Sequence, residues 1–134
     1  MREGLYYSRE HEWVKLEGKL ARVGVTDYAQ KKLGDIVYVE LPDVGKRVSQ
    51  VEEKKTKEME SGAVESIKAV SMVYAPMSGS VREVNSALQD RPELVNTSPY
   101  DEGWICLLEP SDPKAELRNL MNASEYAEFL KGLK

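Results

Sequence analysis

Sulfur and imidazole ligands are scarce in this chain. Its 134 residues include one cysteine, Cys106, and one histidine, His11. A single cysteine cannot form an internal disulfide, and one cysteine with one histidine supplies too few soft ligands for a zinc site. Because Cys106 lies within the apolar run 104–108, we interpret it as a core side chain rather than a reactive thiol.

Long hydrophobic runs are also absent. The longest purely apolar stretch is this same run 104–108, far shorter than the roughly 20 residues that a membrane-spanning helix needs. Residues 1–12 are polar and mixed in charge, whereas a secretory signal begins with basic residues followed by an apolar stretch. We therefore expect a cytoplasmic protein with no transmembrane helix and no membrane partner.

Positive charge is in short supply as well. The chain has 19 Lys and Arg residues against 23 Asp and Glu residues, a formal net charge of −4. This sign is unfavourable for binding a phosphate backbone, so nucleic acid is not an expected partner. Hydrophobic residues at 41% supply enough apolar material for a core, and the length fits one domain over residues 1–134.

Catalytic motifs are missing. Neither Gly-x-Gly-x-x-Gly nor Gly-Lys-Ser/Thr occurs, so nucleotide-dependent chemistry is unsupported. His11 is the only histidine that could act as the base in nucleophilic catalysis, and its place beside acidic residues near a strand favours a structural imidazole. The sequence therefore points away from an enzyme.

Short strands separated by turn residues dominate the pattern. Runs of β-branched and aromatic residues predict strands, and cap residues followed by apolar spacing predict helices. The fold class is predicted to be α+β, a small β-sandwich or barrel with short helices, two of them at the C-terminus. The expected strands cover 12–16, 19–25, 36–41, a segment from 48, 63–67, 70–75, 79–84 and 103–109, and the expected helix caps are Asp27, Asn85, Asp112 and Asn122.

A charge run over residues 52–60 interrupts this pattern. Its sequence, Glu-Glu-Lys-Lys-Thr-Lys-Glu-Met-Glu, offers no apolar face to bury. We interpret it as a solvated loop or a short exposed helix rather than a docking surface.

One lysine is distinguished by its position. Only Lys68 and Ala69 separate the expected strands 63–67 and 70–75, so Lys68 is predicted at the tip of a tight hairpin with its ammonium in water. An exposed lysine titrates near about 10.4 and is a poor nucleophile at neutral pH. Acylation would convert it into a neutral tether for a reactive group, although an ordinary surface lysine is the alternative.

Motifs around this hairpin resemble a known family. Residues 65–71, Glu-Ser-Ile-Lys-Ala-Val-Ser, and residues 74–79, Tyr-Ala-Pro-Met-Ser-Gly, are similar to the lipoylation signature of glycine cleavage system H proteins. The resemblance implies a lipoyl-domain-like β-sandwich with the modified lysine at a hairpin tip. It continues, in the family's order, through 11–14, 24–30, 33–39, 41–45, 84–88, 92–96, 99–100 and 103–104.

The resemblance also implies a carrier that performs no catalysis itself. Lys68 would hold lipoic acid in amide linkage, attached by a lipoate-attaching enzyme. The arm would accept an aminomethyl group derived from glycine at a PLP-dependent glycine decarboxylase and present it to a tetrahydrofolate-dependent aminomethyltransferase. Dihydrolipoyl dehydrogenase, a flavin enzyme, would then reoxidise the dithiol.

Further site residues follow from the same resemblance. The loaded arm of the family folds into a surface cleft whose polar groups correspond here to Glu12, Lys32 and Met72. The position of Met72 is commonly acidic in the family, and the run 52–60 is an insertion where most members have a short Gly-containing turn. Glu65 flanks the exposed turn with little packing role, so we expect it to aid recognition by the lipoate-attaching enzyme.

Two alternatives stay open at this point. A lipoyl carrier of the same fold that serves another pathway, such as sulfur oxidation or lipoate relay, is favoured by Met72 and by the insertion. A non-lipoylated interaction module is the other. A biotin carrier is disfavoured because its resemblance would predict Met-Lys-Met at the tip, where this chain has Ile-Lys-Ala at 67–69.

Overall fold

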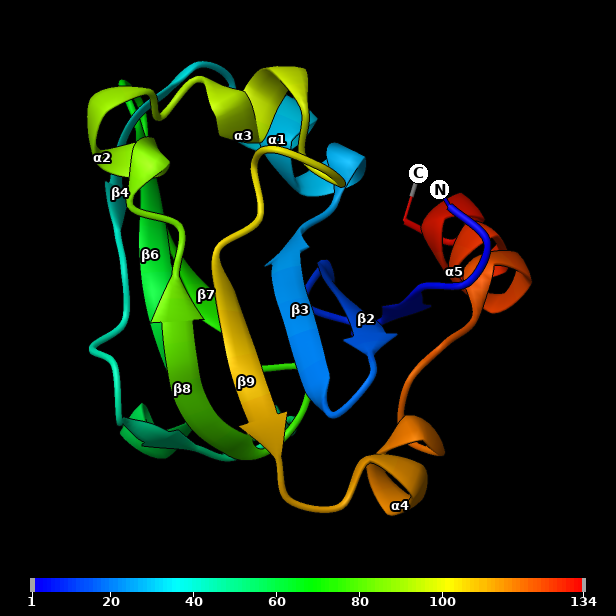
Figure 1. Cartoon of the computed structure of the whole chain (residues 1–134). Helices are drawn as coiled ribbons and strands as arrows, with labels where there is room; N and C mark the ends of the chain where they lie inside the picture. The colour runs from blue at the N-terminus through cyan, green and yellow to red at the C-terminus, as the bar shows by residue number, and fades with distance from the viewer. Residues whose placement is uncertain (1, 134) are drawn as a thin grey trace.

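Two antiparallel β-sheets form the body of the protein in the computed structural model, which describes residues 2–133; positions 1 and 134 of the expected domain lie outside them. The larger sheet has the strand order β1-β2-β3-β9-β8-β5, and the smaller has the order β4-β6-β7 (Figure 1). This arrangement with short helices confirms the expected α+β class. The strands are β1 Tyr6–Tyr7, β2 Glu12–Glu17, β3 Leu20–Val25, β4 Ile36–Glu40, β5 Arg47–Val48, β6 Glu60–Ser66, β7 Val70–Tyr74, β8 Gly79–Val84 and β9 Cys106–Pro110.

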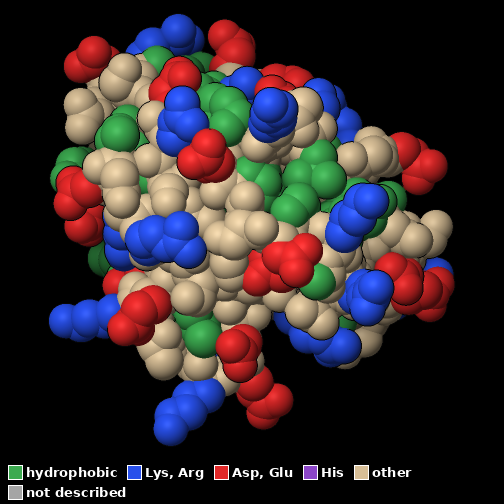
Figure 2. Space-filling view, turned by 60° about the horizontal axis from the view of Figure 1, so that its bottom comes forward, with side chains coloured by type: hydrophobic (Ala, Val, Ile, Leu, Met, Phe, Trp, Pro, Cys, Tyr) green, Lys and Arg blue, Asp and Glu red, His purple; other side chains and the backbone are tan. Residues whose placement is uncertain are grey.

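Short helices cover the ends of the sheets. In Figure 1, α1, α2 and α3 gather at one end of the molecule, and α4 lies towards the other. The face turned forward in Figure 2 carries acidic and basic side chains interspersed among small hydrophobic areas. Within residues 2–133, no helix is long and apolar enough to cross a membrane. The helices are α1 Asp27–Leu33, α2 Ala87–Asp90, α3 Leu94–Thr97, α4 Pro113–Leu117 and α5 Ala123–Lys131, with a 3-10 helix at Lys57–Met59.

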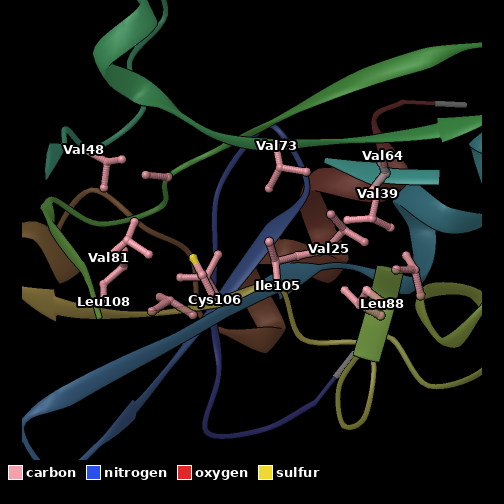
Figure 3. Close-up of a cluster of buried hydrophobic side chains, with 14 of the residues drawn as sticks. Val25, Val39, Val48, Val64, Val73, Val81, Leu88, Ile105, Cys106 and Leu108 are labelled. Atoms are coloured by element: carbon pink, nitrogen blue, oxygen red, sulfur yellow. The ribbon is translucent and has the colours of Figure 1, made fainter. Parts of the chain in front are cut away.

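The core lies between the two sheets. Val39, Val64 and Val73 from the smaller sheet face side chains of the larger sheet, among them Val81 and Cys106 (Figure 3). All five are almost fully buried, and burial of each aliphatic side chain stabilises the fold by about 1.5 to 3 kcal/mol. The buried position of Cys106 confirms its interpretation as a core side chain.

A second, aromatic cluster attaches α5 to the larger sheet. The rings of Tyr7 and Tyr126 stack with their centroids 4.5 Å apart, and the indole N–H of Trp13 donates to the carbonyl of Pro99 at 3.0 Å. The Nδ1 atom of His11 lies 2.7 Å from the hydroxyl of Tyr126. His11 therefore helps hold the C-terminal helix, as expected of a structural imidazole.

Two of the predicted helix caps are wrong. Thr26 caps α1 by accepting the N–H of Ala29 at 3.2 Å, and Asp27 is already the first helical residue. Threonine and aspartate are both favourable N-cap residues, and because Thr26 and Asp27 are adjacent, the sequence alone does not show which of them caps the helix. Asn85 does not cap α2, because its amide donates to two backbone carbonyls of the loop before β9, each at 2.8 Å. The caps predicted at Asp112 and Asn122 are confirmed.

Strand β4 is less buried than the sequence suggests. Ile36 and Val39 are buried, but Val37 and Tyr38 are 51% and 55% exposed. The smaller sheet packs on the core with one face and meets solvent with the other, and the register shift between Ile36 and Tyr38 leaves both Val37 and Tyr38 exposed. The apolar residues of β4 therefore contribute both to the core and to an exposed apolar surface.

Several boundaries also differ from the predictions. The first hairpin turns at residues 18–19 rather than 17–18, because Glu17 pairs with Leu20. Strand β9 begins at Cys106, three positions later than the predicted 103. Helix α3 was not predicted from local spacing, since a single turn is too short to reveal a helical period.

The charged run 52–60 is anchored at both ends. Its single apolar residue, Met59, is 6% exposed, so the expectation of a run with nothing to bury is wrong. The N–H of Ala75 donates to the carbonyl of Met59 at 2.7 Å, and the carbonyl of Ala75 accepts the N–H of Val51 at 2.8 Å. We call residues 52–56, which lie between these anchors and precede the 3-10 helix, the strap.

Strand β6 depends on a glycine at its bulge. Gly62 has a φ of +120°, and a Cβ built there would lie 2.5 Å from the carbonyl oxygen of Glu40. We expect Gly62→Ala to lower the free energy of unfolding by about 3 kcal/mol, because backbone strain adds to a steric clash. Gly18→Ala is the control: its φ is +62° with no neighbouring atom within 4 Å, so its expected cost is about 1 kcal/mol. Urea unfolding measures both, and equal losses would contradict the role of the clash.

Candidate functional site

The hairpin between β6 and β7 displays Lys68. The N–H of Ser66 donates to the carbonyl of Ala69 at 2.8 Å, and the N–H of Ala69 donates to the Ser66 hydroxyl at 3.2 Å. These two bonds close the loop from both sides and leave Ile67 and Lys68 at its tip, one residue earlier than the predicted turn. Both tip residues are exposed, with Ile67 87% accessible.

The stem of Lys68 lies towards the C-terminal end of α1. A Cβ built on Gly34, the residue that ends α1, would lie 3.9 Å from the Cε atom of Lys68. The hairpin tip is thus at the end of the molecule that carries α1 to α3 (Figure 1). A small residue at Gly34 leaves room for the lysine stem beside the helix.

Glu65 lies at the base of this hairpin on the outer face of the smaller sheet. It pairs with Tyr38 of β4 and with Val70 of β7. Both neighbours are more than half exposed, whereas Glu65 itself is half-buried. A protein that handles Lys68 therefore meets a carboxylate set between two apolar side chains.

Glu12 is buried between strands of different sheets. The hydroxyl of Ser8 donates to its Oε1 atom, and the N–H of Tyr74 donates to its Oε2 atom at 2.9 Å. Burial raises the pKa of Glu12 to about 8, although these two hydrogen bonds act in the opposite direction. At neutral pH the carboxyl therefore favours its protonated form. Its hydrogen bond to Tyr74 joins β2 to the end of β7.

Lys32 and Met72 lie apart from each other. The ammonium of Lys32 is 5.9 Å from the ring centre of Tyr28, whose ring is 4.5 Å from that of His11. Met72 is 38% exposed on β7 and lines a hollow of about 140 Å³ together with Pro42. The structure therefore does not gather Glu12, Lys32 and Met72 around one hollow.

A larger groove of about 560 Å³ lies beside Glu12. Ser8, the hydrogen-bond partner of Glu12, contributes to its lining, and Lys55 reaches into it from the strap. Sequence reasoning missed both residues, because neither stands in a recognisable motif. The other lining residues are Arg9, Glu10, Gln50, Val51, Glu52, Glu53, Asn119 and Leu120.

The thiol of Cys106 takes no part in the site. Burial raises the pKa of Cys106 to about 12, so its thiolate is scarce at neutral pH. Across residues 2–133, no group of three or more His, Cys, Asp or Glu side chains is arranged to hold a metal ion. Neither a reactive thiol nor such a metal cluster therefore contributes to the site within these residues.

The raised pKa of Glu12 makes the free energy of unfolding depend on pH. Its pKa is higher in the folded protein than the ordinary 4.5, so its favourable contribution is complete below pH 4.5 and is lost as the pH rises towards about 8. We expect the difference in unfolding free energy between the parent and Glu12→Gln to shrink by a few kcal/mol across this interval. Urea unfolding at a series of pH values measures that difference.

A control isolates this effect from other titrating groups. Glu83 on β8 is exposed, so Glu83→Gln should give a difference from the parent that stays constant over the same pH range. A constant difference for Glu12→Gln as well would show that Glu12 titrates alike in the folded and unfolded chains.

Comparison with known proteins matches the sequence of this chain to one family. The family model described as "Glycine cleavage H-protein" matches residues 5–133. A probable glycine cleavage system H protein of Pyrococcus abyssi is 54% identical over 134 residues, covering 99% of this chain and 94% of that protein. A glycine cleavage system H protein of Bacillus licheniformis is 51% identical over 127 residues, covering 95% of this chain and 94% of that protein.

A solved structure agrees with the sequence comparisons. The crystal structure of a glycine cleavage system H protein from Mycobacterium marinum superposes with a TM-score of 0.81 at 38% identity, and the match covers 96% of this chain and 97% of the other. The family match extends over nearly the whole chain and includes both sheets. The chain belongs to the glycine cleavage H-protein family, whose members are carrier components of a multienzyme system and not catalysts.

Proposed function

We propose that this chain carries lipoic acid in amide linkage on Lys68. The observation that carries the proposal is the hairpin itself, which holds Lys68 exposed at its tip while hydrogen bonds between Ser66 and Ala69 fix the turn. Acylation removes the charge of the lysine and turns its flexible side chain into the base of a longer arm. The family to which the chain belongs supports this assignment.

The arm is proposed to serve glycine cleavage in the cytoplasm. It accepts an aminomethyl group at a PLP-dependent glycine decarboxylase, presents it to a tetrahydrofolate-dependent aminomethyltransferase and is reoxidised by dihydrolipoyl dehydrogenase. The chain, as one domain, supplies no reacting group of its own and acts by presenting the arm. Exposed apolar side chains beside the tip, including Ile67 and Val70, give these enzymes a surface to bury on docking.

The remaining site residues have proposed roles in recognition and docking. Glu65 is proposed to aid recognition by the lipoate-attaching enzyme, because its carboxylate lies at the hairpin base. Lys32 is proposed to meet the loaded arm on the side of α1, and the buried Glu12 is proposed to act on the arm through its partner Ser8, which lines the groove. Met72 is proposed to meet it from the outer face of β7, where a thioether offers apolar contact but no ion pair.

A lipoyl carrier that serves another pathway is the second candidate. It is favoured by Met72, which cannot pair with a cationic group, and by the anchored strap. Exchange of the glycine carboxyl carbon with carbon dioxide, catalysed by the cognate decarboxylase, separates the two candidates. Exchange with the fully lipoylated protein supports the glycine pathway, and its absence favours the other pathway.

Substitution of the tip lysine tests lipoylation. We expect Lys68→Arg to abolish the addition of a lipoyl group, because arginine keeps the positive charge but has no acylable amine. Intact mass after incubation with lipoate, ATP and a lipoate-attaching enzyme measures the addition. The melting temperature should be nearly unchanged, since the side chain is exposed. Lipoylation of Lys68→Arg, or a parent protein that stays unmodified while another acceptor is modified, would contradict the proposal.

Substitution of Glu65 tests recognition at the hairpin base. We expect Glu65→Ala to slow lipoylation of Lys68 about tenfold, the effect of losing one hydrogen bond to a charged group. Initial rates by intact mass measure this. Glu83→Ala, which removes an exposed carboxylate from the other sheet, should lipoylate at the parent rate. Equal rates for Glu65→Ala and Glu83→Ala would remove Glu65 from the recognition surface.

A further inference from the structure

The strap places an ammonium group inside the larger groove. The Nζ atom of Lys55 lies 3.0 Å from the Oε2 atom of Glu10 and donates to the carbonyl of Glu53 at 2.9 Å. It also lies 5.7 Å from the ring centre of Tyr74. A carboxylate, a carbonyl and an aromatic face are the groups that recognise a primary ammonium.

This contact is better shielded than an ordinary surface ion pair. The side chain of Lys55 is 27% exposed and that of Glu10 is 40% exposed, whereas the neighbouring Lys54 is exposed. Partial shielding from water strengthens an ion pair relative to a fully exposed one. Lys55 is therefore held in the groove, and its neighbour provides a matched comparison.

The strap is a short, largely exposed segment between two backbone anchors. Its two ends are fixed by the backbone of Ala75, which bonds Val51 on one side and Met59 on the other. Between these anchors, Glu52, Glu53, Lys54 and Thr56 are exposed, and Lys55 is the residue that turns inward. Opening the strap therefore exchanges the contacts of Lys55 for water while both anchors stay in place.

The groove is within reach of the hairpin lysine. Tyr74, which faces the ammonium of Lys55, ends the strand that begins at Val70 beside the tip. Tyr74 lies six positions after Lys68, and fully extended backbone of that length spans about 20 Å at most. An extended lysyl-lipoyl arm that lies along β7 covers a distance of this order.

We propose that Lys55 is an internal occupant of an ammonium site in this groove, and that the strap is a latch displaced when another primary ammonium enters. The proposal rests on the proposed function, because the group assigned there to the arm ends in a primary amine. Loading the arm then replaces Lys55 beside Glu10 and releases the strap, whose exposed charges form a different surface in the loaded protein. A partner that contacts the strap can thereby distinguish loaded from unloaded carrier.

Lysine acetylation rates test the latch. The lipoylated protein is reduced to the dithiol, and both thiols of its arm are S-alkylated with excess 2-bromoethylamine, which adds two primary ammonium groups, or with excess 2-bromoethanol, which adds two neutral hydroxyls of similar size. The thiolate displaces bromide in both reactions, and Cys106 is spared by its burial and raised pKa. Limited acetylation with an N-hydroxysuccinimide ester followed by peptide mass analysis then compares Lys55 with Lys54.

The expected pattern is specific to the charge on the arm. Lys55 should react several-fold more slowly than Lys54 in the hydroxyethyl form and in the unlipoylated protein, and at a similar rate to Lys54 in the aminoethyl form. Glu10→Gln should raise the rate of Lys55 in the unlipoylated protein, because it removes the carboxylate partner.

Contrary results separate this proposal from the proposed function. The latch proposal is contradicted if Lys55 reacts slowly in all three forms. It is also contradicted if Lys55 reacts as fast as Lys54 in the unlipoylated protein. Neither result affects the proposal that Lys68 is lipoylated. A parent protein with no lipoyl mass overturns the proposed function, and with it the role of the strap in sensing the arm.

Discussion

Glu12 forms a buried link between strands that belong to different sheets, and its hydrogen-bond partner Ser8 lines the larger groove. Its backbone lies in β2 of the larger sheet, while its carboxyl accepts the N–H of Tyr74 at the end of β7 in the smaller sheet. The hydroxyl of Ser8 completes the link on the N-terminal side. Burying a carboxyl is costly unless it is hydrogen-bonded or protonated, so this region tolerates few rearrangements and fixes one wall of the groove.

The hairpin that displays Lys68 is rigid for a different reason. Its strands are anchored in the core through Val64 and Val73, and its loop is closed by bonds to both the backbone and the side chain of Ser66. Order in the strands and exposure at the tip suit the role proposed for Lys68, because its amine is presented in one place and an arm attached there would keep its freedom. The strap at the other end of β7 contrasts with this, since backbone hydrogen bonds to Ala75 fix its ends while its middle is held through the side chain of Lys55.

Membership in a carrier family explains why the chain has so few catalytic groups. Its single histidine bonds to Tyr126 and stacks near Tyr28, and its single cysteine lies in the core. The chemistry assigned to the arm needs no reacting side chain from the protein. What the fold must supply is an accessible lysine, a surface for docking and a polar groove that can receive a charged group.

The sequence by itself determined the class of the fold, the position of the hairpin and the exposed lysine at its tip, because these follow from short-range turn chemistry and the alternation of apolar residues. It also determined the capping of α4 and α5, where the cap and its partner are three residues apart. The burial of Glu12, the position of Lys55 against Glu10 and the exposure of Val37 and Tyr38 were decided only by the tertiary structure. Each depends on which strand lies at a sheet edge and which loop crosses which groove, and those contacts join residues that local sequence patterns cannot bring together.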